Sequence, residues 1–414
     1  MEKKTHTIHI IGGGISGLVA AQVLENHGVS PVIIEGTDRV GGRVKTDTVN
    51  GYRLDHGFQV LLTVYPAAKQ YLDYDSLDLQ KFVPGASIFK NKNQKIIGDP
   101  LRDLSLTFST LFSGIGTVSD KIKILKLNTF LKRKSIEAIF EEKEGTTFNY
   151  LQNYGFSEGM IADFFTPFFS GIFLETKLET SSRMFEFVYK MFGQGAAAVP
   201  KGGMEEIPKQ LKKNLKNTKF LFNTKVSNVK DGKIKLADGT EIPSEYTIIA
   251  TEPSKLVPNL VNQSVEWKSC YTLYFTVPKR IIKKPLIGLV PDKNSLINNL
   301  FYPTSLATQP GGGEELLSVT VINNKGMNDE ELTKKVQNEL SELCEIRDTQ
   351  FLKLYKIPMS LPNLRDLRYS ILPSETHLSS GILLAGDTQL NGSLNAAMIS
   401  GERAALAVVQ ALDN

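Results

Sequence analysis

The 414-residue chain has little of several residue types that would point to a specialised site. Its two cysteines, Cys270 and Cys344, lie far apart without metal-ligand spacing. They fit a reducing, cytoplasmic compartment and do not fit a disulfide framework. Five scattered histidines form no metal-binding pattern, so we predict no metal site. The net charge of +4, from 48 basic and 44 acidic residues, is too small to indicate a nucleic-acid partner.

The chain also lacks long hydrophobic runs. Its N-terminus enters the first apolar run directly, without the apolar core and small-residue cleavage site of a signal peptide. The uncharged run at 104–119 is rich in polar residues and shorter than the roughly 20 residues of a spanning helix. We therefore expect a chain that is soluble or at most peripheral to a membrane. Its length is enough for two domains with substantial cores.

The clearest motif lies in the first forty-odd residues. An apolar run at 8–11 leads into Gly12-Gly13-Gly14-Ile15-Ser16-Gly17, a predicted helix at 18–27, and a second apolar run that ends at Glu35. This order of strand, glycine turn, helix, strand and acid is typical of a dinucleotide-binding βαβ unit.

Each part of this motif has a physical role in the prediction. Gly12 allows a tight turn, Gly14 lets the backbone approach a pyrophosphate, and Gly17 lets the helix pack closely on the strand. The start of the helix, at Ile15 and Ser16, would face the phosphates. The Glu35 carboxylate would accept hydrogen bonds from a ribose.

A second glycine turn follows shortly after Glu35 and Gly36. It reads Arg39-Val40-Gly41-Gly42-Arg43, and it would bring backbone and two guanidinium groups to the same pyrophosphate. Such a second clamp suits a tightly held FAD better than a nicotinamide cofactor that must leave. In these residues the sequence resembles the flavin-containing amine oxidase and phytoene desaturase superfamily.

The resemblance implies an α/β fold and FAD as cofactor. The FAD-binding domain would be Rossmann-like, of the glutathione reductase type, and interleaved with an α+β substrate-binding domain in a protoporphyrinogen oxidase-like arrangement. We assign residues 1–75, 200–252 and 375–414 to the FAD-binding domain. Residues 76–199 and 253–374 would form the substrate-binding domain.

Three further segments match the superfamily's cofactor contacts. At Asp55-His56-Gly57 the backbone would run close to the flavin, and His56 would only line the site; an acid or base role for His56 is the weaker alternative. The residue matching Val226 contacts the adenine through its backbone in the superfamily. Thr251, which ends the apolar run at 246–251, is another expected cofactor contact.

The C-terminal segment carries the second strong motif. The apolar run at 381–385 ends in Gly386 and Asp387, and the matching acid in the superfamily binds the ribitol or phosphate end of the flavin. Ser393 would then begin a helix that presents Leu394 and Ala397, with its N-terminus toward the flavin ring.

Two kinds of segment, one apolar and one basic, bear on where the substrate binds. The block at 164–174 and the Phe and Met residues at 184–192 predict core packing, and they could also line a cavity for a large apolar molecule. The basic amphipathic segment at 120–135 predicts either a helix with a solvated face, which we favour, or a surface helix that contacts anionic lipid.

The sequence identifies the reaction and substrate less firmly than the cofactor, because one fold hosts several activities. Amine oxidases of the superfamily place an aromatic residue just before the final helix, where this chain reads Asn391-Gly392-Ser393, and no residue of the sequence is identified as their lysine near flavin N5. We therefore favour a phytoene desaturase-like oxidoreductase that transfers a hydride from a large isoprenoid- or polyene-like substrate to flavin N5, with oxygen or a quinone as acceptor. The alternatives are an amine oxidase or protoporphyrinogen oxidase, and a non-catalytic, flavin-bearing carrier of a lipophilic molecule.

Overall fold

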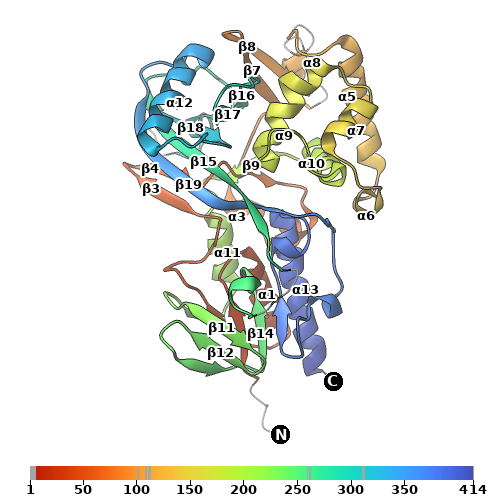
Figure 1. Ribbon diagram of the computed structural model, residues 1–414, viewed down its shortest axis with the longest axis vertical. Helices are drawn as coiled ribbons and strands as arrows, with labels where there is room; N and C mark the ends of the chain where they lie inside the picture. Colours follow the sequence, from red (N-terminus) through yellow and green to blue (C-terminus); the bar gives the residue numbers. More distant parts are fainter. Residues whose placement is uncertain are drawn as a thin grey trace.

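A computed structural model describes residues 6–99, 102–107, 110, 113–258, 260, 263–309 and 313–413. Part of the uncharged run at 104–119 lies outside these residues. The elements form two regions that meet at the middle of the long axis, with β1, α1 and α13 in one region and α5 to α10, α12 and the largest sheet in the other (Figure 1).

The first region is built on a parallel sheet with strand order β10–β2–β1–β14–β20. Every neighbouring pair is parallel. The strands are β1 (Ile8–Ile11), β2 (Val32–Ile34), β10 (Lys219–Leu221), β14 (Tyr246–Ile249) and β20 (Ile382–Leu384). The inner strands are mostly apolar because both faces of the sheet are covered, whereas the edge strand β10 is largely exposed.

One face of this sheet is covered by helices, and the other by a small antiparallel sheet. Helices α1 (Ile15–Asn26), α11 (Glu206–Asn214) and α13 (Leu394–Leu412) pack on the first face, where Ile8 and Ile10 are buried. The second face, with Ile11, packs on the sheet of β11 (Val226–Lys230), β12 (Lys233–Leu236) and β13 (Glu241–Pro243).

The second region contains a seven-stranded mixed sheet, in the order β19–β15–β18–β17–β16–β7–β8. Only β7 and β16 pair in parallel among these neighbours. Helix α12 (Asp329–Cys344) packs its apolar stripe on this sheet. The strands are β7 (Gly85–Lys90), β8 (Asn93–Gly98), β15 (Glu266–Val277), β16 (Ile287–Leu289), β17 (Ile297–Phe301), β18 (Glu315–Val321) and β19 (Gln350–Asn363).

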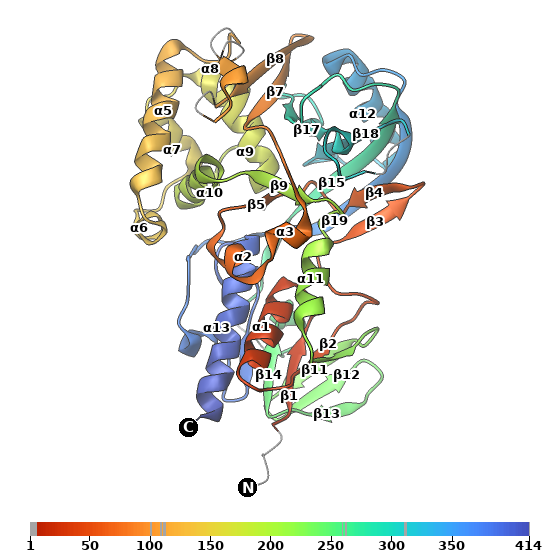
Figure 2. The same cartoon turned by 180° about the vertical axis from the view of Figure 1, so that it is seen from behind.

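Beside this sheet lies a group of helices that carries the phenylalanine-rich block. They are α5 (Val118–Arg133), α6 (Ile136–Glu141), α7 (Thr147–Asn153), α8 (Glu158–Met160), α9 (Thr166–Phe173) and α10 (Ser182–Gln194). A π-helical turn, η2 (Ile161–Phe165), joins α8 to α9. Helix α5 lies along the outer margin of the molecule in both views (Figures 1 and 2).

Short elements connect the two regions. They include the sheet of β5 (Leu61–Leu62), β9 (Ala197–Pro200) and β6 (Leu79–Lys81), the hairpin of β3 (Thr46–Val49) and β4 (Tyr52–Asp55), and the helices α2 (Pro66–Tyr71) and α3 (Tyr74–Leu77). The 3-10 turns are η1 (Leu104–Leu106), η3 (Pro253–Lys255), η4 (Pro303–Ser305), η5 (Pro373–Thr376) and η6 (Asp387–Gln389).

The structure confirms the α/β class and the Rossmann-like sheet, with small differences at element ends. Helix α1 begins at Ile15, three residues earlier than predicted, because Gly14 serves as its N-cap residue and Gly17 lies inside the helix. All five strands of the parallel sheet come from within 1–75, 200–252 and 375–414. No described helix has both the length and the apolar character needed to cross a bilayer.

Helices α1 and α13 approach each other so closely that one contact excludes any side chain. A Cβ atom built on Gly401 of α13 would lie 2.2 Å from the Ser16 carbonyl oxygen of α1. This contact holds the C-terminal helix against the glycine turn.

We expect Gly401→Ala to lower the free energy of unfolding by about 1–3 kcal/mol, because the added methyl group forces the two helix backbones apart. Urea denaturation at fixed FAD concentration measures this change. Gly159→Ala is the matched control, since nothing lies within 4 Å of a Cβ atom at that helical glycine. Equal loss of stability in the two variants would contradict the close contact.

Candidate FAD and substrate site

The two glycine turns stack on each other at the carboxyl end of β1. The Gly41 N–H donates to the Gly13 carbonyl oxygen at 2.9 Å, and Gly12, Gly41 and Gly42 all have positive φ. A Cβ atom on Gly12 would lie 2.9 Å from the Ala250 carbonyl oxygen, and one on Gly17 would lie 2.1 Å from the Gly12 carbonyl oxygen. Glycine is required at these positions because a side chain would separate the backbone segments.

The start of α1 has the properties of a phosphate-binding site. Its N-cap residue, Gly14, supplies no side-chain cap, so the first N–H groups of the helix have no side-chain acceptor there. No atom lies within 4 Å of a Cβ position on Gly14, so the turn faces open space. An anion placed there would meet both the free N–H groups and the positive end of the helix dipole.

Glu35 is buried at the end of β2 and holds the first turn. Its Oε2 accepts from the Gly13 N–H at 2.7 Å, and its Oε1 accepts from the N–H and hydroxyl of Thr37, each at 2.8 Å. A carboxylate can accept about four hydrogen bonds, so capacity remains for a ribose hydroxyl.

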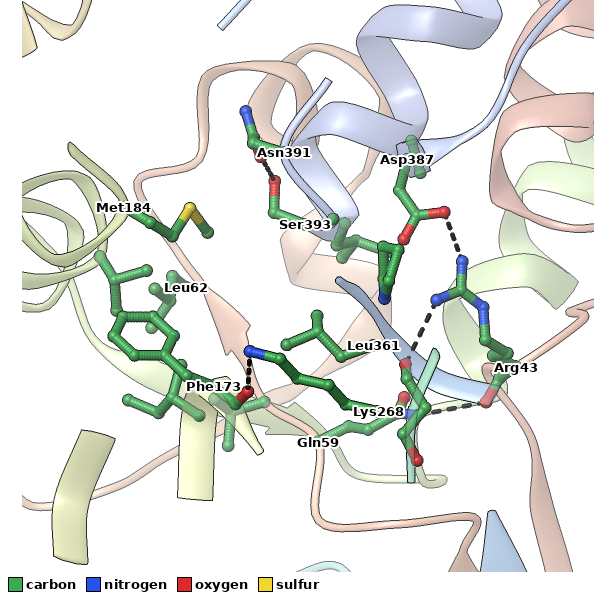
Figure 3. Close-up of a pocket in the computed structure, with 18 of the residues that line it drawn as sticks. Arg43, Gln59, Leu62, Phe173, Met184, Lys268, Leu361, Asp387, Asn391 and Ser393 are labelled. Carbon is green, nitrogen blue, oxygen red and sulfur yellow. Dashed lines mark hydrogen bonds and ion pairs between the residues drawn. The ribbon is translucent and has the colours of Figure 1, made fainter. Parts of the chain in front are cut away.

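Arg43 and Asp387 join the two ends of the chain at this site. The Arg43 guanidinium forms an ion pair with the buried Asp387 carboxylate (Figure 3). It also donates to the Ser360 carbonyl oxygen at 3.3 Å and lies over the Trp267 ring. The Gly386 N–H donates to the Ser400 hydroxyl at 2.9 Å. The Ser393 hydroxyl caps α13 by accepting from the Ala396 N–H.

A single cavity of about 1500 Å³ extends from these turns to the helices of the second region. Most of the predicted cofactor contacts line it, namely Gly12, Gly14, Ile15, Ser16, Glu35, Gly36, Gly41, Gly42, Arg43, Val226, Thr251, Gly386, Asp387, Ser393, Leu394 and Ala397. The wall opposite them is largely aromatic and apolar, with Phe58, Phe82, Phe164, Phe168, Phe169, Phe173, Phe192, Tyr65, Tyr189, Met184 and Val188.

Four predicted positions do not line this cavity. Gly17 packs against the Gly12 backbone inside α1, and Gly57 lines a separate small cavity beside Phe58. Arg39 binds Asp47 at 2.6 Å and Glu205 at 3.0 Å instead of reaching toward the α1 N-terminus.

His56 belongs to the same polar cluster as Arg39. Its Nε2 lies 2.7 Å from an Asp47 oxygen, and its ring is tilted on the Tyr355 ring with centroids 4.4 Å apart. Burial raises the pKa of Asp47, but hydrogen bonds from Arg39, His56 and Tyr355 hold that pKa below its ordinary value. His56 was expected to line the cofactor site, but it is not among the residues that line the large cavity.

Lys268 is the cavity residue that the sequence interpretation missed. It lies on β15, and its Nζ donates to the Phe173 carbonyl oxygen at 3.1 Å and to the Thr180 hydroxyl at 3.3 Å (Figure 3). Burial lowers the pKa of Lys268. The predicted strand began at 271, whereas β15 begins at Glu266 and has an irregular register between Lys268 and Cys270. Such irregularities redirect side chains near sites and hide them from an alternating pattern.

The comparisons with known proteins agree with this geometry. Residues 15–409 match the family described as flavin containing amine oxidoreductase. The chain belongs to this family. FAD is therefore its cofactor, and the chain is a flavin-dependent oxidoreductase.

Curated relatives match over short segments. A possible lysine-specific histone demethylase 1 of Drosophila melanogaster is 43% identical over 63 residues, which are 15% of this chain and 7% of that protein. Protoporphyrinogen oxidase 2 of Arabidopsis thaliana is 26% identical over 167 residues, 40% of this chain and 32% of that protein. The first relatives are thus matched over less than a tenth of their own length.

Solved structures match the whole fold at low sequence identity. Cyclohexylamine oxidase from Brevibacterium oxydans IH-35A has a TM-score of 0.72 and 16% identity, covering 99% of this chain and 100% of that one. A putrescine oxidase bound to putrescine has a TM-score of 0.71 and 15% identity, covering 98% and 99%. These likenesses confirm the protoporphyrinogen oxidase and amine oxidase type of fold.

We expect Glu35→Ala and Asp387→Ala each to weaken FAD retention by about 10- to 100-fold, because each leaves cofactor hydroxyls or Arg43 without a charged partner. The bound FAD is first released from each variant, and the refolded apoprotein is then dialysed against known FAD concentrations. The bound fraction gives the dissociation constant of FAD.

Glu241→Ala is the control, because Glu241 is an exposed carboxylate of β13 that pairs only with Lys233 in the described structure. If both site variants retain FAD as tightly as the parent, Glu35 and Asp387 do not contact the cofactor.

Proposed function

We propose that the chain is an FAD-dependent oxidase or dehydrogenase that removes a hydride from a bulky, largely apolar substrate of the amine or protoporphyrinogen type. Oxygen or a quinone would be the electron acceptor. The observation that carries this proposal is the continuity of the cavity, because one space is lined by the cofactor turns at one end and by phenylalanines at the other. A substrate in the apolar half therefore lies next to the cofactor.

When bound, the flavin supplies the redox chemistry by accepting the hydride. The protein's own residues bind the cofactor and orient the substrate. The α1 N-terminus and Glu35 would hold the pyrophosphate and ribose, while Asp387 and Arg43 would hold the ribitol end. The N-terminus of α13, at Ser393, is the positive end of a helix dipole and would stabilise negative charge on the ring. The aromatic wall excludes water from the substrate.

The presence of Lys268 in the cavity wall makes amine oxidation a stronger candidate than the sequence indicated. Two features count against amine oxidation in the sequence: residues 391–395 include no aromatic residue, and no lysine is identified there as a flavin contact. A lysine is in fact present in the cavity wall, while residues 391–395 supply no aromatic side chain. The family and its named members also favour the amine and protoporphyrinogen alternative over the phytoene desaturase-like one.

The isoprenoid or polyene substrate remains the second candidate, and one observation favours it. The carboxylates that line the cavity near Phe173 are already paired or face solvent: Glu175 accepts hydrogen bonds from Lys177 and Thr180, and the Glu179 side chain is 71% exposed. A polyene needs only apolar contacts there. The flavin-bearing carrier has no observation of its own in its support.

A substrate panel under anaerobic conditions distinguishes these candidates. We expect hydrophobic amines or a porphyrinogen to bleach the flavin absorbance in stopped-flow mixing, because hydride transfer reduces the ring. Bleaching by isoprenoids alone would establish the second candidate. Binding of a ligand without bleaching by any compound class would contradict an oxidoreductase role and favour the carrier.

Lys268→Met tests the role of the cavity lysine. If the Lys268 ammonium acts on the substrate or the flavin, we expect kcat to fall about 100-fold with FAD content unchanged, because the variant removes this hydrogen-bond donor from the cavity wall. Since burial lowers the pKa of Lys268, the parent should lose its ammonium-dependent rate at a lower pH than an ordinary lysine would, and Lys268→Met should lack that alkaline limb.

Lys255→Met is the control, since Lys255 lines the cofactor side of the same cavity and pairs with Glu252 at 2.6 Å. An unchanged rate and pH profile in Lys268→Met would remove this residue from the reaction.

A further inference from the structure

Helix α5 exposes an apolar stripe that no other part of the described chain covers. Val118, Ile122 and Leu125 are 72%, 50% and 42% exposed, and their spacing of four and three residues puts them on one face of the helix. Phe130, 49% exposed, lies nearby on the next turn. Four of the eight large hydrophobic residues that are exposed in the described structure belong to this one helix.

The opposite face of α5 is firmly packed. Leu127 and Leu131 are fully buried in the main core, and the helix contacts α10 along this face. Its N-terminus has a capping box between Thr117 and Asp120. The apolar stripe is therefore presented by an anchored helix and does not arise from a frayed end.

Basic side chains lie on both sides of the stripe. Helix α5 carries Lys121, Lys126, Lys132 and Arg133 around the stripe, whereas Lys123 donates to the Gly155 carbonyl oxygen. Its one acid, Asp120, is buried and accepts hydrogen bonds from Thr117 and Ser157, so it adds no exposed negative charge. Lysines beside exposed apolar residues are typical of helices that lie in the interface of an anionic membrane.

The cavity reaches the surface at this helix. Lys121, Ile124, Leu125 and Asn128 line it from α5, and Leu125 is both a lining residue and exposed to solvent. The helix lies at the outer margin of the molecule in both views (Figures 1 and 2). A lipophilic molecule leaving a bilayer at α5 would therefore enter the apolar half of the cavity.

We propose that α5 docks this protein on an anionic lipid surface, with Val118, Ile122 and Phe130 inserted between headgroups and the lysines on the phosphates. The contact is interfacial, in keeping with the absence of a described helix able to span a bilayer. Delivery of substrate through this contact rests on the apolar substrate proposed above, whereas the docking itself does not. The positive charge of α5 favours an anionic lipid surface over a neutral apolar partner, because the basic side chains can pair with lipid phosphates.

Vesicle sedimentation of the FAD-loaded, full-length protein tests the docking. We expect binding to phosphatidylcholine vesicles that contain phosphatidylglycerol, much weaker binding to phosphatidylcholine alone, and release at high salt. Val118→Ser with Ile122→Ser, and separately Lys126→Glu with Arg133→Glu, should each weaken binding at least about tenfold. None of these four residues lines the cavity, so anaerobic flavin reduction by detergent-dispersed substrate should be unchanged.

The matched control is Phe351→Ser with Leu372→Ser, two exposed hydrophobic residues on other elements, which should bind as the parent does. Absence of parent binding, or equal binding by the parent and both α5 variants, would overturn the proposal. Loss of a dimer in Val118→Ser with Ile122→Ser, without vesicle binding by the parent, would instead identify the stripe as an interface between two copies. Because the readout is binding, these outcomes are separate from failure of the substrate panel.

Discussion

The fold depends on backbone segments that touch where no side chain could fit. Gly17 brings α1 against the Gly12 turn, Gly41 rests on Gly13, and Gly401 brings α13 against Ser16. These contacts join the beginning and end of the chain into one cofactor platform. The ion pair between Arg43 and Asp387 then connects residues 344 positions apart at the same place. Because these contacts fix the glycine turns in place, the turns form a rigid wall of the cavity.

Two long insertions between strands of the cofactor region form the walls of the substrate cavity. Between β5 and β9 the chain forms the helices that carry the phenylalanine block, and between β14 and β20 it forms most of the mixed sheet. The cavity is walled by both excursions and floored by the glycine turns. The phenylalanine wall, the half-buried Lys268 and Leu125 of α5 all line this one cavity.

Local patterns predicted the platform well, because its function depends on nearby glycines and on strand ends. The βαβ unit, Asp387 and the start of α13 follow from residues adjacent in sequence. Arg39 and His56 were placed less well, because their partners Asp47, Glu205 and Tyr355 come from three other elements. Lys268 was missed because an irregular register in β15 breaks the alternation that would have marked it. The substrate wall was recognised as apolar, but its shape depends on packing between distant helices.

The central claim is that FAD and an apolar substrate share one continuous cavity. The most direct measurement is a crystal structure of the FAD-loaded protein with a hydrophobic ligand. The account predicts the adenine end of FAD near Glu35 and Val226, the flavin end near Asp387 and Ser393, and the ligand between the flavin and the phenylalanine wall. A ligand bound outside that wall, or FAD held away from the α1 N-terminus, would contradict it.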